Sequence, residues 1–407
     1  MRIFKNRSNG ENEMKKLMAG LLVIVVAALC LSYAYFYYGK HSASKKPAKV
    51  EKINKTEEKE PEKIEPVHVK LMATGDVMFH MPTYKSAFNK EKGEYDFTSF
   101  YEKVSEDLKG ADFAFANLET TINPNRPLAS YPMFNTPKEA LKYLKAAGFK
   151  GMSTANNHCI DTGLEGIFTT IDELDANGFI HFGTRKTEDE KPPIVDLKGI
   201  KVGFISYSEI FNGMEGVIPA DKKYVISPIN YEKIKSDIDY LKENGADIII
   251  SMPHYGVEYK TEPTKLQQEA SKFMLDNGVD LVLGSHPHVL GRAGMWEVGG
   301  KNKFLIYSMG NSISNQRQPW MGTYDTEMGV LVEIDITKAE KINFEVALHP
   351  TYVARFRQEG GNRYYVYKMT DLFEGGKYQG DIDEKERQKV HMLYERAKEI
   401  MREKYVK

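Results

Sequence analysis

The sequence predicts an α/β fold with parallel or mixed central strands, preceded by one transmembrane helix. Two observations lead to this prediction: an uncharged apolar run near the N-terminus, and a series of amphipathic helices that each end at a glycine before a short apolar strand. Alternating helices and strands are typical of layered α/β domains. The length of 407 residues and the hydrophobic content of 41% suit one large domain or two ordinary ones.

The uncharged run predicts a membrane anchor. It covers residues 17–38, which is long enough because about 20 apolar helical residues cross a bilayer core. Aromatic side chains crowd its C-terminal end, as at a membrane interface. Basic residues are equally numerous on its two sides, so charge alone leaves the orientation open. The short head formed by residues 1–16 favours a cytoplasmic N-terminus and an exported C-terminal domain.

A change in composition marks the expected start of the folded domain. Residues 39–66 are rich in Lys, Glu and Pro and poor in large apolar side chains, so they are expected to form a flexible tether. The domain is expected over residues 67–350, followed by a C-terminal extension over 351–407 with a charged helix. The formal net charge of −1 argues against nucleic acid as a partner.

Four helix–glycine–strand units follow one another in this domain. Their helices are expected to end at Gly148, Gly178, Gly245 and Gly278, because glycine suits the left-handed conformation at helix ends. Each apolar run that follows reads as a buried strand. After about residue 290 the pattern changes to strands, so a mostly β second half of the sheet is expected.

Six polar clusters each follow one of the strand-like runs. In open α/β sheets, ligand-binding groups gather just beyond the carboxyl ends of the strands, so these clusters are expected to converge on one edge. The residues brought together would be Asp76, His80, Glu119, Asn157, His158, His254, His286, His288 and Asn311. Two further amides in the same clusters, Asn117 and Asn156, are expected to line the same pocket.

The residue types in these clusters indicate a metal site. Carboxylate oxygen, amide oxygen and imidazole nitrogen together suit Mn²⁺, Fe or Zn²⁺, and two such metals can clamp the attacking and leaving oxygens of a phosphoryl group. Asp76 and Glu119 are the candidates for a bridging carboxylate. His158, with His80 as a second candidate, would stabilise charge or protonate a leaving group. The alternative for each residue is structural: a cap, a turn or a satisfied core histidine.

Three other features refine this expectation. His286 and His288 flank Pro287, and alternate residues of an extended chain point to one face, which makes this pair the most specific element. The loop over residues 310–329 is either a lid over the site or a plain surface loop. Cys159 has no evident activating base and is expected to be buried and inert.

The sequence contains no P-loop and no GxSxG elbow.

Jointly, the clusters resemble the CapA-type capsule biosynthesis proteins, the membrane-anchored component of bacterial poly-γ-glutamate synthesis. The matching segments are ATGDVMFH (73–80), FANLET (115–120), TANNHCIDTG (154–163), PHYGVEY (253–259), GSHPHV (284–289) and YSMGNS (307–312). The resemblance implies a calcineurin-like metallophosphoesterase fold, a four-layered α/β sandwich with mixed sheets. It also implies His158 as the acid and metal positions at Asp76, Glu119, Asn157, His254, His286 and His288.

The same resemblance implies membrane-bound synthase and export subunits as partners, the poly-γ-glutamate chain as ligand, and a single-pass protein of the cell membrane with its domain outside. The sequence departs from ordinary metallophosphoesterases in three places: His80 lies four residues after Asp76, Asn117-Leu118-Glu119 replaces a Gly-Asp pair, and Cys159 follows His158 where an acid is usual, with Asp161 close by. Two alternatives stay open. One is a free-standing membrane-anchored phosphoesterase acting on envelope phosphates or nucleotides, and the other is a non-catalytic binding module on the same fold.

Overall fold

The structure is a computed structural model that describes residues 27–33, 35, 65–358 and 361–407. The chain divides into two units, Met1–Lys63 and Ile64–Lys407. Residues 27–33 and 35 of the first unit are helical. Within the described ranges, no helix combines the length and the apolar character needed to cross a membrane. The expected head, most of the expected anchor and nearly all of the expected tether lie outside the described residues.

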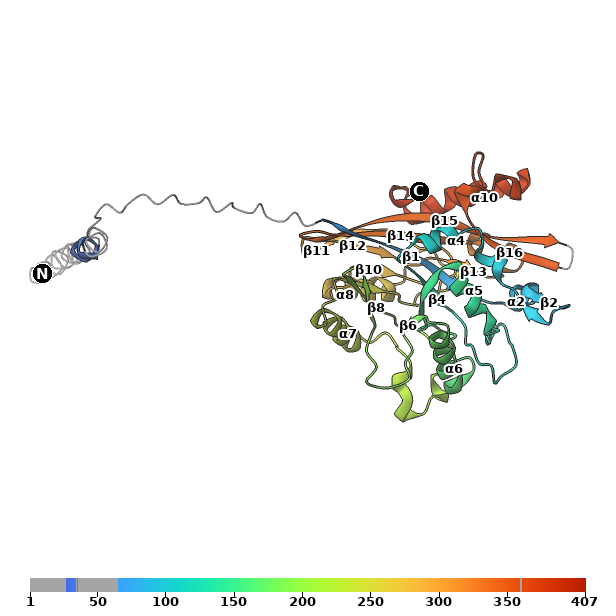
Figure 1. The fold of residues 1–407 in the computed structure, drawn as a ribbon, viewed down its shortest axis with the longest axis horizontal. Coiled ribbons are helices and arrows are strands. Elements are labelled where there is room, and N and C mark those ends of the chain that lie inside the picture. Colours follow the sequence, from blue (N-terminus) through green and yellow to red (C-terminus); the bar gives the residue numbers. More distant parts are fainter. Residues whose placement is uncertain (1–26, 34, 36–64, 359–360) are drawn as a thin grey trace, which may run out of the picture. The chain divides into compact units, whose positions relative to one another are not determined.

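Two mixed β-sheets form the centre of the second unit (Figure 1). The first has the order β16-β15-β14-β1-β4-β5-β6, with β13 paired to β1. Its strands are β1 (Val67–Val77), β4 (Phe113–Leu118), β5 (Phe149–Ser153), β6 (Ile180–Phe182), β13 (Asn311–Ile313), β14 (Met328–Lys338), β15 (Ile342–Gln358) and β16 (Gly361–Lys368). Strands β1, β4, β5 and β6 are parallel, whereas β14, β15 and β16 alternate in direction.

The second sheet has the order β11-β12-β10-β9-β8-β7. Its strands are β7 (Ile194–Leu197), β8 (Ile200–Ile205), β9 (Ile248–Ser251), β10 (Leu281–Leu283), β11 (Ala293–Val298) and β12 (Lys301–Ile306). Four central strands are parallel, and the edge strands β7 and β11 are antiparallel to their neighbours. A two-stranded ribbon, β2 (Phe88–Asn89) and β3 (Glu94–Tyr95), lies apart from both sheets. The predicted α/β class with mixed sheets is confirmed.

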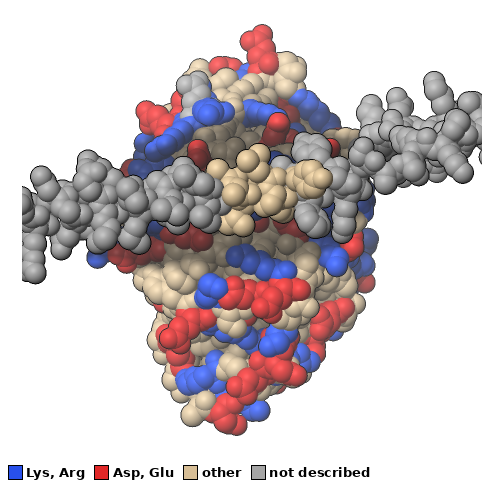
Figure 2. Space-filling model, turned by 90° about the vertical axis from the view of Figure 1, so that its left-hand side faces the viewer, with Lys and Arg blue, Asp and Glu red and all other residues tan. Residues whose placement is uncertain are grey.

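Helices connect and cover the sheets. They are α2 (Met81–Ala87), α3 (Thr98–Tyr101), α4 (Ser105–Gly110), α5 (Glu139–Ala147), α6 (Gly163–Ala176), α7 (Tyr231–Glu243), α8 (Lys265–Asn277), α9 (Gln318–Met321) and α10 (Glu384–Met401). Short 3₁₀ turns are η1 (Met214–Val217), η2 (Ala220–Val225), η3 (Asp325–Glu327), η4 (Met369–Leu372), η5 (Gln379–Asp381) and η6 (Glu403–Tyr405). On the face drawn in Figure 2, basic and acidic side chains are interspersed, in keeping with the near-zero net charge.

Three of the four apolar cores in the described residues pack the two sheets and the helices on them. The largest lies between the sheets, where Phe113 of β4 and Phe204 of β8 approach to 5.2 Å between ring centroids. A second core packs α4 and α5 on the outer face of the first sheet, and a third packs α7 and α8 on the outer face of the second sheet. Burying one large apolar side chain contributes about 1.5–3 kcal/mol, so these contacts dominate the stability of the unit.

Glycines end the helices much as the sequence predicts. Gly148 follows α5 and Gly278 follows α8, both with φ of 122°. A Cβ on Gly148 would lie 2.8 Å from backbone atoms of residues 108 and 109, so a side chain has no room there. After α6 and α7 an asparagine comes first, and Gly178 and Gly245 take the left-handed conformation one residue later.

The C-terminal residues belong to the same unit as the rest of the domain. Strand β15 runs through residue 350 and pairs with β14 and β16, so the expected boundary at that residue falls inside a strand. Helix α10 lies within the stretch expected to be helical and buries Val390, Leu393, Ala397 and Met401 in the core between the sheets. In Figure 1 this helix lies at the opposite end of the unit from α6 and α7.

Candidate metal centre

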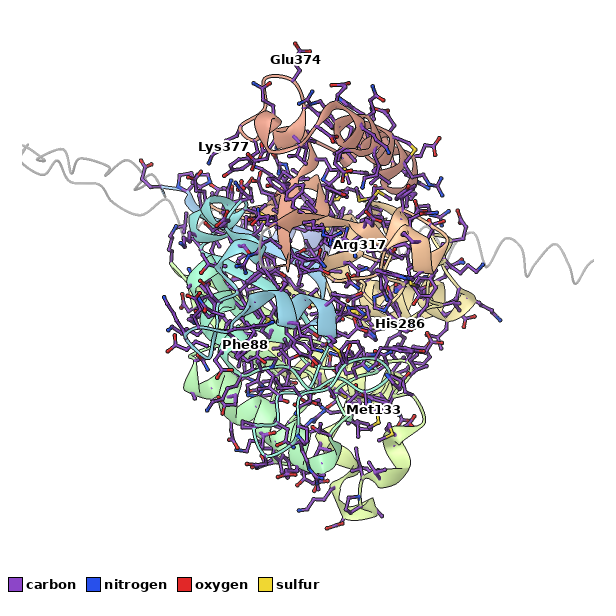
Figure 3. All side chains as sticks on the ribbon, turned by 90° about the vertical axis from the view of Figure 1, so that its right-hand side faces the viewer. Phe88, Met133, His286, Arg317, Glu374 and Lys377 are labelled. Atoms are coloured by element: carbon purple, nitrogen blue, oxygen red, sulfur yellow. The ribbon has the colours of Figure 1, made fainter. Side chains whose placement is uncertain are left out.

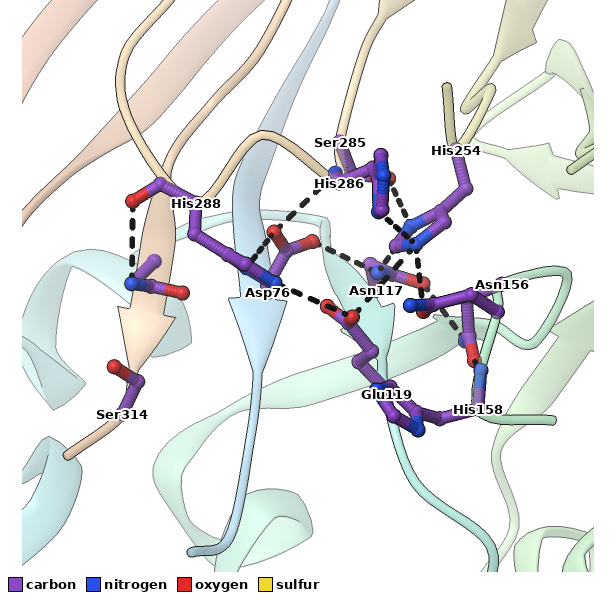
Figure 4. A network of polar contacts seen from close by, with 12 residues as sticks. Asp76, Asn117, Glu119, Asn156, His158, His254, Ser285, His286, His288 and Ser314 are labelled. Atoms are coloured by element: carbon purple, nitrogen blue, oxygen red, sulfur yellow. Dashed lines mark hydrogen bonds and ion pairs between the residues drawn. The ribbon is translucent and has the colours of Figure 1, made fainter. Parts of the chain in front are cut away.

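The predicted polar clusters converge where strands of both sheets end (Figure 4). Strands β1, β4 and β5 of the first sheet bring Asp76, the segment 117–119 and the segment 156–158. From the second sheet, β9 leads to His254 and β10 leads to the segment 286–288. In Figure 3, His286 is seen between Arg317 above and Met133 below. The convergence expected from sequence is therefore present, although it draws on two sheets and not on one edge of a single sheet.

A close backbone contact positions Asp76. Strand β1 is irregular between Thr74 and Asp76, where it pairs with both β4 and β13. The N–H of Asp76 donates to the carbonyl oxygen of Gly310 at 3.0 Å. A Cβ on Gly75 would lie 1.9 Å from that same oxygen, so only glycine allows β1 to approach this closely. The bulge directs the carboxylate of Asp76 toward the histidines in Figure 4.

The two histidines after β10 lie in a strained loop. His286 has φ of 99° and His288 has φ of 57°, a region that residues with a side chain seldom adopt. The expected extended conformation is therefore wrong for this segment, although both side chains reach the site, with ring centroids 6.0 Å apart. Non-glycine residues at positive φ cost about 1–3 kcal/mol each and cluster at functional sites.

Two overlapping groups of side chains could hold a metal ion. One group is Asp76, Glu119 and His254, and the other is Glu119, His286 and His288; the ligand atoms of each lie within 4.8 Å of one another. Glu119 belongs to both groups. Its Oε1 lies 3.7 Å from Nε2 of His254 and 3.7 Å from Nε2 of His288.

Burial sets the protonation of these groups. Asp76, Glu119 and His254 have no solvent-exposed surface. Burial raises the pKa of the Glu119 carboxyl well above its usual value, and the charge of Asp76 adds to the effect. Burial also lowers the pKa of His254 well below its ordinary value and that of His286 to about 3, with the neighbouring histidines acting in the same direction. Both imidazoles are thus neutral at pH 7, which is the form that binds metal.

Glu119 supplies the test of whether a metal fits. Both of its carboxylate oxygens are buried and accept no hydrogen bond among the described residues. A buried polar group without a partner costs about 1–3 kcal/mol, and more when it is charged. A bound cation would remove that cost, and the surrounding nitrogen and oxygen donors suit a divalent transition metal. The residues present therefore fit a metal ion.

Amide side chains hold the carboxylates and histidines in place. Asn117 donates to Oδ1 of Asp76 at 2.8 Å, and Asn156 donates to the backbone carbonyl of Leu118 at 2.8 Å. Oδ1 of Asn157 lies 3.0 Å from Nε2 of His254, so the amide oxygen of Asn157 adjoins the two ligand groups.

Two other expected site residues have supporting positions. Asn311 donates to the backbone carbonyl of His288 at 3.2 Å, and its own Oδ1 is buried with no hydrogen-bond partner among the described residues. Nδ1 of His80 accepts the N–H of Asn315 at 3.2 Å, and burial lowers the pKa of His80 to about 3. His80 lies in neither ligand group of the described chain.

His158 is paired with an acid that the sequence analysis left off the site. Its Nδ1 lies 2.7 Å from Oδ2 of Asp161, which also accepts the N–H of Phe134 at 2.5 Å. The ring of Phe134 packs edge-on against the His158 imidazole, with centroids 4.7 Å apart. Cys159 is buried, and burial raises its pKa to about 12, as expected for an inert thiol.

One further residue was missed by the sequence reasoning. Ser285 Oγ lies 3.1 Å from Nδ1 of His254, the ring nitrogen opposite the one that faces Glu119. Such a contact fixes the ring orientation of a metal-binding histidine. The sequence feature that could have indicated Ser285 is its place directly before the His-Pro-His segment, shortly after β10.

Comparison with known proteins gives relatives from capsule synthesis. The chain is 27% identical over 285 residues to the PGA biosynthesis protein CapA of Bacillus subtilis (strain 168), covering 67% of this chain and 69% of that protein. It is 26% identical over 268 residues to the capsule biosynthesis protein CapA of Bacillus anthracis, covering 63% of this chain and 62% of that protein. Among solved structures, the sulfate thiohydrolase SoxB of Thermus thermophilus matches with a TM-score of 0.39 and 13% identity, over 69% of this chain and 56% of SoxB.

The family model named bacterial capsule synthesis protein PGA_cap matches residues 70–316. This range contains every member of the two ligand groups as well as His158 and Asp161. The chain therefore belongs to the PGA_cap family of bacterial capsule synthesis proteins.

Proposed function

We propose that this chain is a membrane-anchored component of poly-γ-glutamate capsule synthesis or export, and that it acts through a divalent metal centre at the strand ends. The observation that carries the metal centre is Glu119, a fully buried carboxylate that belongs to both ligand groups and has no hydrogen-bond partner in the described part of the chain. The family and the two CapA relatives support the role in capsule synthesis. We further propose residues 17–38 as the anchor, with the domain outside the membrane.

In this proposal Asp76, Glu119, His254, His286 and His288 hold one or two ions of Mn, Fe or Zn. Asn157, as the sixth expected ligand, completes the shell or orients His254. When bound, a divalent ion supplies Lewis acidity toward a carbonyl or phosphoryl oxygen. Glu119 would bridge the two ligand groups, because one oxygen already lies near a histidine of each.

His158 is the proposed general acid. Its Nδ1 is engaged by Asp161, which fixes the ring and leaves Nε2 as the atom that carries or accepts a proton. The buried side of the ring packs on Phe134, so the imidazole has little freedom to turn. His80 is a supporting residue in this arrangement, because its Nδ1 accepts a backbone N–H of the following loop.

The same acid arrangement supports a second candidate function. A histidine oriented by a carboxylate beside a two-metal site suits hydrolysis of phosphate esters, so a free-standing phosphoesterase acting on envelope phosphates or nucleotides is the alternative proposal. Disabling the site would remove surface polymer if the chain acts in polymer synthesis. It would cause phosphate esters to accumulate if the chain is a phosphoesterase.

Replacement of the chromosomal copy by Glu119→Gln tests the proposal. We expect loss of surface poly-γ-glutamate with normal amounts of the protein in the membrane fraction. The matched control is Glu165→Gln, the same change at a solvent-exposed carboxylate that bonds Asn125 and Arg126. Normal surface polymer in the Glu119→Gln strain would overturn the proposal, and accumulated phosphate esters in that strain would favour the alternative.

A further inference from the structure

A cavity lies at the ends of β6 and β8, which are neighbours of two strands that lead to the candidate metal centre. Strand β6 is the neighbour of β5, which leads to Asn157, and β8 is the neighbour of β9, which leads to His254. The cavity therefore lies one strand further along the same end of both sheets. It contains about 370 Å³ of empty space, part of it open to solvent.

Among the charged side chains that line this cavity, cations outnumber carboxylates by one. Arg185, Lys191 and Lys233 line it, against the two carboxylates Glu190 and Asp237. The Asp237 carboxylate is engaged, since it pairs with Lys233 and accepts the hydroxyl of Tyr207 at 2.8 Å. In the described chain, neither Arg185 nor Lys191 has a carboxylate within salt-bridge distance.

The Arg185 guanidinium is held in place by one side-chain hydrogen bond and keeps further donors free for a ligand. Its backbone N–H donates to the carbonyl of Val225 at 3.0 Å, and its Nη2 donates to Oγ of Ser227 at 3.0 Å. Ser227 in turn donates to the carbonyl of Gly183 at 2.6 Å. Of the five N–H groups of the guanidinium, one thus has an acceptor among the described residues. The other groups are available to a ligand that offers two oxygens in a plane.

The charges around the cavity also favour an anionic ligand. Burial lowers the pKa of the Lys233 ammonium, and the positive charges of Arg185 and Lys191 act in the same direction, while Asp237 opposes them. Three cations against two carboxylates leave one net positive charge in the lining. A single carboxylate matches that charge, whereas a phosphate carries up to about two negative charges at neutral pH.

We propose that this cavity binds one carboxylate of an anionic polymer that runs along the strand ends past the metal centre, with Arg185 as the principal contact. This inference rests on the proposed function, which supplies the polymer class. Linkage of glutamate through its γ-carboxyl leaves the α-carboxylate of every residue free, so a γ-linked chain presents one such group per residue. The cavity would then set the position of the chain relative to the metal centre.

Calorimetric titration of the full-length chain in detergent with γ-linked tri-glutamate tests the inference. Arg185→Gln is expected to weaken binding by about tenfold or more, the range for a lost charge-assisted hydrogen bond. Arg185→Lys should fall between this variant and the wild type, because it keeps the charge and loses the planar fork. The matched control is Lys186→Gln, at the next residue, whose ammonium pairs with Asp172 on the surface; binding should change less than about twofold.

The inference is overturned if a folded Arg185→Gln variant keeps the wild-type affinity for γ-linked tri-glutamate. It is also overturned if the wild type binds a tri-glutamate with amidated α-carboxylates as tightly as the unmodified one. If Arg185→Gln does not fold, Lys191→Gln at an exposed lining residue makes the same test. Different results would refute the cavity proposal and the proposed function. Loss of surface polymer in the Glu119→Gln strain together with normal tri-glutamate binding by Arg185→Gln would refute the cavity alone. Normal polymer in the Glu119→Gln strain would refute the proposed function.

Discussion

Nδ1 of His158 lies 2.7 Å from Oδ2 of Asp161, three residues further along the chain. Both side chains are buried, and the turn between them ends at the start of α6. The acid that is missing at position 159 is thus supplied two residues later. The pair gives the imidazole a fixed orientation beside the candidate metal ligands, which a proton donor requires.

Asp161→Asn should therefore impair function without emptying the metal centre. We expect surface polymer to fall about 10²-fold, the lower range for loss of a general acid, while metal content stays at the wild-type level. Because the two residues act as one unit, the double variant with His158→Ala should be no worse than His158→Ala alone. If the losses of surface polymer add up in the double variant, or if Asp161→Asn makes the wild-type amount of polymer, the pair is structural.

Metal binding should strengthen as pH rises. The pKa of Glu119 is raised by burial and by Asp76, so a proton competes with a metal for this carboxyl up to a higher pH than at an ordinary glutamate. A metal must displace that proton, and its affinity then gains up to about tenfold per pH unit until the carboxyl ionises. Equilibrium dialysis with Mn²⁺ or Zn²⁺ between pH 6 and 8 measures this slope. A flat profile in the wild type would contradict the assignment of Glu119 as a ligand.

Gly75→Ala should destabilise the domain and disturb the site. Its Cβ would lie 1.9 Å from the backbone oxygen of Gly310, so β1 or its neighbour must move. We expect a loss of about 3 kcal/mol in the free energy of unfolding, the upper range for overpacking, together with weaker metal binding. Gly110→Ala is the matched control, because a Cβ there would meet no described atom within 4 Å beyond its chain neighbours and its own helix backbone. That change should stay within about 1 kcal/mol.

Helix α10 should be integral to the stability of the domain. Leu393 is 1% exposed in the core between the sheets, so Leu393→Ala should cost about 2–5 kcal/mol in denaturant unfolding. Met392, next to it, is 52% exposed, and Met392→Ala should change stability by about 0.5 kcal/mol or less. Equal effects of the two substitutions would mean that α10 is not packed on the core.

The proposed orientation predicts that the domain can be labelled from outside. The side chain of Lys265 is 89% exposed, so a membrane-impermeant maleimide should label Lys265→Cys in intact cells. Native Cys159 is buried and should not react. A cysteine in the proposed cytoplasmic head, Ser8→Cys, should be labelled only after the cells are permeabilised. Labelling of Lys265→Cys only after permeabilisation would reverse the orientation.

Periodicity and glycine placement were enough to predict the α/β class and the helix ends. Gly148 and Gly278 follow their helices directly, because an amphipathic helix and its C-terminal glycine are local features of the sequence. The polar clusters were also found, since a buried strand that ends in Asp, Asn or His is a local pattern. That they come from two packed sheets was not predictable, because strand order depends on contacts between distant segments.

The site details that were missed depend on backbone conformation. Positive φ at His286 and His288 leaves no mark in the composition of a His-Pro-His segment, so an extended chain was expected. Asp161 reaches His158 because the segment between them turns, which spacing alone does not reveal. The boundary expected at residue 350 falls inside β15, whose length depends on pairing with β14 and β16 and not on a local signal.

The divalent metal content of the purified full-length chain tests the central claim most directly. After incubation with Mn²⁺, Fe²⁺ or Zn²⁺ and removal of free metal, elemental analysis should find at least one bound ion per chain in the wild type and in Glu165→Gln. Glu119→Gln should bind at least about tenfold more weakly, since even changes to residues behind metal ligands cost 10–100-fold. Equal metal content in Glu119→Gln and the wild type, or none in the wild type, would contradict the account.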